Sequence, residues 1–117
     1  MEDISNSTLE KMLSDREPLT VVFVYTPLCG TCKLAEKMVA VVDSTFESLP
    51  IFSLNINHSP VFAQKWKIQS VPCLLLFQKG LGVERIYAFH SIGYIHNILK
   101  PYAAAWSLLE NEQTERG

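Results

Sequence analysis

The sequence predicts an α/β domain in which a central sheet is covered by helices on both faces. Three segments are continuous runs of apolar, β-branched and aromatic residues, as expected for strands that are buried on both sides. Helically spaced apolar residues lie between these runs, so strands and helices alternate along the chain. The 117 residues are 48% hydrophobic, which suits one domain with its own core. The predicted buried strands are 21–25, 51–56 and 73–77.

The first helix is expected ahead of the first buried strand. Ser7-Thr8-Leu9-Glu10 has the pattern of a capping box, in which a hydroxyl and a carboxylate satisfy free N–H groups at a helix start. The helix should run through about Leu13 and end at Arg16-Glu17-Pro18, because proline disfavours helix in the residue before it.

Two further helices are predicted between the buried strands. Asn57-His58-Ser59-Pro60 suggests an N-cap followed by proline at the first helical position, and the helix then carries Val61, Phe62 and Trp66. The other helix runs from Lys33 onward. Its apolar face is expected to contain Leu34, Met38, Val41 or Val42, Thr45 and Leu49.

The last part of the chain predicts a hairpin and a long helix. Lys79-Gly80-Leu81-Gly82 is a turn, and 83–87 should pair antiparallel with the strand before it. Ser91 is a candidate N-cap for a helix in which Pro101 should produce a kink. The polar segment 110–117 is expected to be a frayed tail. We expect residues 1–117 to form a single domain. The apolar residues of this helix are Ile95, Ile98, Leu99, Tyr102, Trp106 and Leu109.

Composition and charge exclude several classes of function. A formal net charge of -2 offers no basic surface for nucleic acid. The longest apolar stretch, 19–28, is too short to span a bilayer, and the acidic start Met-Glu-Asp differs from a secretion signal. We therefore expect a cytoplasmic protein that binds neither membranes nor nucleic acid.

Two cysteines separated by two residues stand where a strand is followed by a helix. In Cys29-Gly30-Thr31-Cys32 the first thiol lies at the helix start, where free N–H groups and the helix dipole favour an anion such as a thiolate. Three cysteines do not make the disulfide framework of a secreted domain, and this spacing is typical of redox thiols in a reducing compartment.

The chain resembles the thioredoxin family from about Thr8 to Trp106. Three motifs carry the resemblance, and the combination of the first and the third is its most specific part. This family has a central mixed sheet of four or five strands with helices on both faces. The motifs are Cys29-Gly30-Thr31-Cys32-Lys33, Leu54-Asn55-Ile56-Asn57 leading into Ser59-Pro60, and the 70–77 segment Ser-Val-Pro-Cys-Leu-Leu-Leu-Phe with Gly80 after it.

The resemblance implies a thiol-disulfide oxidoreductase that acts on protein disulfides. Cys29 would attack the substrate disulfide and Cys32 would resolve the mixed disulfide. Pro72 would be cis and lie beside the cysteine pair, and an extended substrate would bind there as an added strand. The substrate-binding residues would be Gly30, Thr31, Val71 and Pro72. No cofactor or metal is expected; the protein should be a monomer, with a disulfide reductase or a low-molecular-weight thiol as electron donor.

Several positions depart from the usual family pattern. The buried Asp and its Lys partner are replaced by Phe23 and Ser53, so both charges are lost together. Without a charged acid–base partner, the buried Cys32 thiol should have a raised pKa. These changes put the rate, the reduction potential and reductase recognition in doubt. The other departures are Leu28 for Trp, Thr31 for Pro, Asn57 for Asp and Ala88 for Gly.

Alternatives remain open at the level of sequence. Cys73 follows Pro72, so it is either a third redox thiol that bonds Cys29 or a small buried core residue. Cys29, Cys32 and Cys73 with a His have the donor types of a zinc or iron–sulfur site. A third alternative is a non-catalytic module that binds extended peptides beside Pro72.

Overall fold

Five strands form one mixed sheet in the computed structural model, which describes residues 1–46 and 49–116, with side chains to Leu109. The strand order is β1-β3-β2-β4-β5; β3 pairs parallel with β1 and β2, whereas β4 pairs antiparallel with β2 and β5. The two-residue strand β1 is too short to leave a pattern in the sequence. The bounds are β1 Glu2–Asp3, β2 Thr20–Tyr25, β3 Ile51–Asn55, β4 Cys73–Gln78 and β5 Leu81–Ile86.

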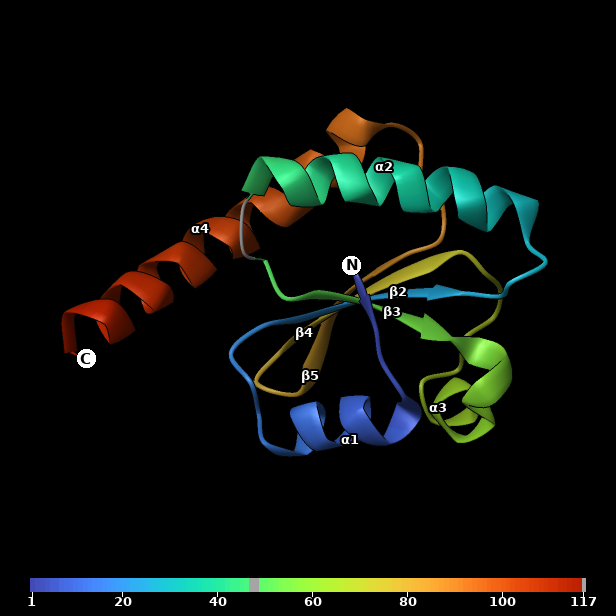
Figure 1. Ribbon diagram of the computed structural model, residues 1–117, viewed down its shortest axis with the longest axis horizontal. Helices are drawn as coiled ribbons and strands as arrows, with labels where there is room; N and C mark the ends of the chain where they lie inside the picture. Colours follow the sequence, from blue (N-terminus) through green and yellow to red (C-terminus); the bar gives the residue numbers. More distant parts are fainter. Residues whose placement is uncertain (47–48, 117) are drawn as a thin grey trace.

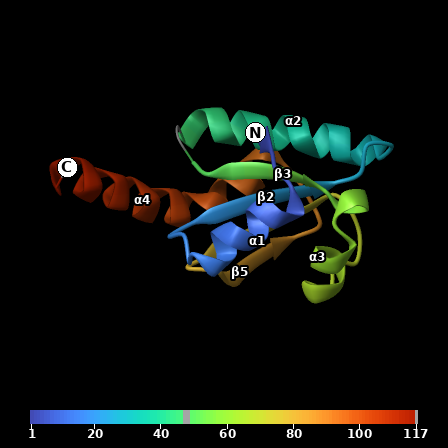
Figure 2. The ribbon, with the colours of Figure 1, turned by 60° about the horizontal axis from the view of Figure 1, so that its bottom comes forward.

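Helices cover both faces of this sheet (Figure 1). Helices α2 and α4 lie over one face, and α1 and α3 lie over the other, as the turned view in Figure 2 also shows. This arrangement confirms the predicted fold class. The bounds are α1 Asn6–Ser14, α2 Gly30–Phe46, α3 Pro60–Lys65 and α4 Ile92–Arg116, with a 3-10 turn at Ile56–His58.

The sheet separates two hydrophobic layers. Side chains alternate between them along each strand, because successive residues of a strand point to opposite faces. Along β2, Val21 and Phe23 face α2 and α4, whereas Val22 and Val24 face α1 and α3. We call these the α2–α4 layer and the α1–α3 layer. The alternation decides on which side of the sheet each candidate functional residue lies.

The buried face of α2 differs from the one predicted. Leu34 is 64% exposed, although its spacing predicts a place on the apolar face. Of the alternatives Val41 and Val42, Val42 is the buried one and Val41 is 47% exposed. The helix begins at Gly30 and directs Cys32 into the core, which fixes the phase of every later turn. Met38 is partly buried against the core as expected. The fully buried residues of α2 are Cys32, Ala35, Val39 and Val42.

The ends of the last two elements also differ from expectation. Strand β5 begins at Leu81, inside the segment predicted as a turn. Helix α4 contains Pro101 and continues to Arg116, where a frayed tail was expected from residue 110; Gly117 lies outside the described residues. The hydroxyl of Ser91 accepts from the Tyr94 N–H at 3.0 Å, which is the predicted N-cap bond. The end of α4 extends beyond the body of the molecule (Figure 1).

Candidate active site

Cys29 and Cys32 form a disulfide at the start of α2. Their Cα atoms are 5.2 Å apart, within the usual range for a bridge. The two sulfurs differ in access: Cys29 is half-buried, whereas Cys32 is 3% exposed in the α2–α4 layer. An incoming group therefore meets Cys29 first.

Hydrogen-bond donors surround the sulfur of Cys29. The backbone N–H of Cys32 donates to Cys29 Sγ at 3.1 Å, and the Thr31 hydroxyl lies 3.2 Å from the same sulfur. Cys29 immediately precedes Gly30, the first residue of α2, so it lies at the positive end of the helix dipole. Both effects favour a negative charge on this sulfur once the disulfide is reduced.

A cavity of about 340 Å³ opens beside the cysteine pair. It brings Thr31 together with Pro72, whose peptide bond with Val71 is cis. Gly30 is exposed next to it, and Val71 packs against both layers of the core. The cavity is lined by Thr31, Leu34, Ala35, Met38, Pro72, Tyr87 and Phe89.

Two apolar residues of this surface were not identified as functional from the sequence. The helical spacing predicts Leu34 on the apolar face of α2, but Leu34 lines the cavity and is largely exposed. Phe89 follows the last strand and belongs to no periodic pattern, so no sequence signal indicates it. Leu28, next to Cys29, is 99% exposed. Exposed apolar side chains therefore cluster around the cysteines.

Aromatic packing occupies the space beneath the cysteine pair. Phe23 is 1% exposed and packs edge-to-face on Phe89, with ring centroids 6.0 Å apart. It also stacks on Tyr25 at 6.3 Å. The residue that replaces the family's buried Asp is thus an integral part of the core.

A polar network connects the sheet edge to Tyr25. Both the Ser53 hydroxyl, at 2.8 Å, and the Tyr25 hydroxyl, at 2.9 Å, donate to Asp3 Oδ1. Burial, the hydrogen bond to Asp3 and nearby negative charge raise the pKa of Tyr25 to about 12. Ser53 therefore replaces the family Lys without leaving an unpaired polar group. The sequence did not reveal this network, because Asp3 belongs to the two-residue strand β1.

Cys73 lies on the other side of the sheet from the cysteine pair. It pairs with Val24 in the β2–β4 register, and its side chain is fully buried in the α1–α3 layer. Burial is the main cause that raises the pKa of this thiol to about 11, against a smaller opposing effect from Arg85. The structure does not bring Cys73 together with Cys29 and Cys32. This placement favours the core-residue alternative over a Cys29–Cys73 bridge.

The same placement bears on the proposed three-cysteine metal site. Among the side chains of residues 1–46 and 49–109, no group of three His, Cys, Asp or Glu is arranged to hold a metal ion. In that same part of the chain, no helix has the length and apolar character needed to cross a membrane.

Comparison with known sequences matches this chain to one family and to a full-length relative. The family model for thioredoxin matches residues 1–100. The thioredoxin-like protein YusE of Bacillus subtilis is 39% identical over 109 residues, which cover 93% of this chain and all of that protein. The chloroplastic M-type thioredoxin of Spinacia oleracea is 25% identical over 74% of this chain, which spans about half of that protein, 48% of its length.

Solved structures support the same fold. A chloroplastic thioredoxin z superposes with a TM-score of 0.75 at 20% identity, covering 89% of this chain and 95% of the other. Mitochondrial thioredoxin 3 of Saccharomyces cerevisiae superposes with a TM-score of 0.74 at 17% identity, covering 86% and 94% of the two chains.

Proposed function

Since the chain belongs to the thioredoxin family, we propose that it reduces protein disulfides with Cys29 as the nucleophile and Cys32 as the resolving thiol. One observation carries the assignment. The accessible sulfur lies at the N-terminus of α2 and accepts the Cys32 N–H, whereas the second sulfur is buried behind it. A dithiol at disulfide distance in this family is a thiol-disulfide oxidoreductase site.

The first step is attack on the substrate. The Cys29 thiolate forms a bond to one substrate sulfur while the substrate S–S bond breaks, and the released substrate thiolate takes up a proton. The helix dipole, the Cys32 N–H and the Thr31 hydroxyl stabilise the thiolate before attack.

The second step releases the product. The Cys32 thiol loses its proton and attacks Cys29 Sγ, forming the Cys29–Cys32 disulfide and freeing the second substrate sulfur, which is protonated. The substrate gains two electrons and two protons. A disulfide reductase or a low-molecular-weight thiol, the proposed partner, returns two electrons to the pair.

We assign substrate binding to the cavity beside the cysteines. An extended segment would lie against Val71 and Pro72, with Gly30 and Thr31 on its other side, and place an apolar side chain between Leu34 and Phe89. Three cysteines without the disulfide framework of a secreted domain suit the reducing cytoplasm, where we propose that the protein acts as a monomer.

One observation favours a second candidate, a peptide-binding module without turnover. Beneath the cysteine pair, the family's charged pair is replaced by Phe23 and Ser53, which provide no ionisable group to accept the Cys32 proton. Such a module would bind extended peptides at the same cavity and would cycle slowly.

Reduction of insulin by dithiothreitol separates these candidates. We expect the wild-type chain to catalyse it, Cys29→Ser to fall to the uncatalysed rate, and Cys32→Ser to accumulate a mixed disulfide through Cys29, detected by mass spectrometry. The matched control is Cys73→Ala, which should keep full turnover. Wild-type turnover in Cys29→Ser would show that the assigned nucleophile is wrong, and no turnover in the wild type would favour the binding module.

A further inference from the structure

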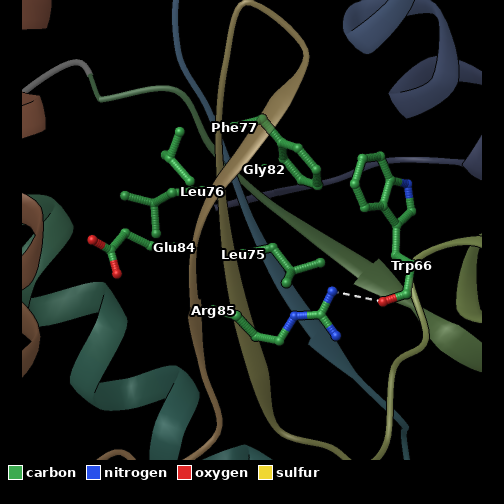
Figure 3. A pocket seen from close by; sticks show the side chains of 8 residues that line it. Trp66, Leu75, Leu76, Phe77, Gly82, Glu84 and Arg85 are labelled. Carbon is green, nitrogen blue, oxygen red and sulfur yellow. Dashed lines mark hydrogen bonds between the residues drawn. The ribbon is translucent and has the colours of Figure 1, made fainter.

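A second cavity lies beside the edge strand β5, on the α1–α3 side of the sheet (Figure 3). Its volume is about 300 Å³, near the lower limit for a small-molecule pocket. We propose that it binds a small organic carboxylate, with the apolar ring or chain inside the pocket and the carboxylate at Arg85. The lining residues that carry the argument are Trp66, Leu75, Phe77, Gly82, Glu84 and Arg85.

A bulge in β5 brings Gly82 and Arg85 onto the same face of the sheet. Phe77 pairs with Gly82 and Leu75 pairs with Arg85, although the register shifts by one residue between them. In a regular strand, residues three apart would point to opposite faces. The extra residue restores both to the α1–α3 side, which is a typical consequence of a β-bulge.

Gly82 leaves the space that a ligand would fill. A Cβ atom built there would lie 3.5 Å from the Trp66 ring and 3.8 Å from the Phe77 ring. Those two rings pack edge-to-face with centroids 4.9 Å apart (Figure 3). Glycine inside a strand weakens it and often marks close approach of another group, so the position suits an apolar group held against two aromatic rings.

Arg85 provides a positioned cation at the rim of this pocket. Its guanidinium donates to the Trp66 carbonyl at 2.6 Å, drawn as a dashed line in Figure 3, to the Lys67 carbonyl at 3.1 Å and to the Tyr87 hydroxyl at 3.2 Å. These three neutral acceptors leave further N–H donors of the guanidinium for a ligand. Among the described side chains, no carboxylate forms an ion pair with it.

The charge around the pocket favours an anion. Lys65 Nζ lies 5.9 Å from the centre of the Trp66 ring, and its ion pair with Glu10 is a loose 3.4 Å. Glu84 points away in Figure 3, and its carboxylate accepts from the Tyr102 hydroxyl on the other side of the sheet. An apolar ligand that carries a carboxylate therefore matches both the rings and the rim.

The bulge also decides between a small molecule and an added peptide strand. A bulge interrupts the regular row of backbone N–H and C=O groups that strand addition requires, and natural edge strands use it for that purpose. The pocket is thus better suited to a free small molecule than to an extended chain that pairs with β5.

The test is an NMR titration of the full-length, ¹⁵N-labelled chain with 3-phenylpropionate, using 3-phenylpropanamide as the neutral counterpart. We expect saturable shifts at the Trp66 indole and the Gly82 amide, and roughly tenfold tighter binding of the carboxylate, as one charge-assisted hydrogen bond would give. Equal affinities for the two compounds would overturn the proposal. So would chemical shifts that still change at about 10 mM ligand, near the weak end of specific ligand binding.

Two variants separate the pocket from the rest of the surface. Gly82→Val fills the space without a backbone conflict and should abolish the shifts, while retained insulin reduction shows that the fold is intact. Arg85→Gln should remove the preference for the carboxylate. Lys37→Gln, an exposed charge change on α2, is the matched control and should bind as the wild type does. Unchanged binding in Gly82→Val would show that the compound binds elsewhere and that this pocket is not its site.

Discussion

The cysteine pair and Cys73 contain the same functional group in opposite environments. Cys29 lies half-buried at the N-terminus of α2, where an N–H donates to its sulfur. Cys73 directly follows Pro72, which lines the cavity beside the cysteine pair, yet its thiol is fully buried in the other layer and its pKa is raised to about 11. Nearness along the chain to the redox site therefore does not make a thiol reactive.

The alternation of β4 explains this difference. Cys73 shares its face with Leu75 and Phe77, whereas Leu74 and Leu76 point toward α2 and α4. Only one side of the sheet contains the cysteine pair. A residue on the other face of β4 is separated from that pair by the thickness of the backbone.

The largest expected difference between Cys29 and Cys73 is in their rates of alkylation. With a pKa of about 11, only a small fraction of Cys73 is thiolate at pH 7.5, and burial blocks access as well. We expect iodoacetamide to modify Cys29 at least about 10³-fold faster than Cys73 in the reduced native chain. Peptide mapping by mass spectrometry measures both rates. In urea the rates should converge, and similar rates in the native chain would contradict the assignment.

A charge restored beneath the cysteine pair tests the redox side of the comparison. Phe23→Asp should lower the free energy of unfolding by about 3–5 kcal/mol, because it removes a buried ring and leaves a buried carboxylate unpaired. In the wild type, resolution by Cys32 should be slow near neutral pH and accelerate as the pH rises.

The variant should change that pH profile if it still folds. Urea unfolding and stopped-flow resolution of a mixed disulfide are the measurements. Phe23→Leu is the control: it should lose less stability, about 1.5 kcal/mol at most, and keep the wild-type pH profile. A wild-type resolution rate that does not vary with pH would refute the idea that Cys32 has no base.

The buried thiol should also affect stability at high pH. Because the folded-state pKa of Cys73 is raised from 9.0 to about 11, the unfolded chain loses this proton first, and stability falls as the pH rises from about 9 to 11. We expect a loss of about 2 kcal/mol, which Cys73→Ala should largely remove. Tyr25 adds a similar effect at higher pH, between about 10 and 12. Urea unfolding of the oxidised protein at several pH values measures this loss. If the free energy of unfolding fell equally with pH in the wild type and in Cys73→Ala, the prediction would be wrong.

The smallest expected effect concerns substrate binding at the redox face. Leu34→Ser should leave the free energy of unfolding within about 0.5 kcal/mol, since the side chain is largely exposed. We expect it to raise KM for insulin several-fold while leaving reduction of a small aromatic disulfide unchanged. Val41→Ser is the matched control, since Val41 is also exposed on α2 but does not line the cavity. Equal effects of the two variants would remove Leu34 from the substrate surface.

The sequence alone predicted the order of the strands and helices from α1 onward, the α/β class and the redox pair. Apolar runs such as 73–77 bury both faces of a strand, and a capping residue such as Ser91 marks a helix start, so these signals are local. The two-cysteine motif is local as well, because its four residues fix the distance between the two sulfurs.

Only the tertiary structure decided which side of each element faces which neighbour. Three features depend on how distant segments pack: the side of the sheet that Cys73 faces, the exposure of Leu34 and the approach of Gly82 to Trp66. One residue of bulge in β5, or a small change in the phase of α2, moves a side chain from core to surface without any change in local pattern. Contacts between distant segments choose among these arrangements, and the sequence pattern of a single element does not contain them.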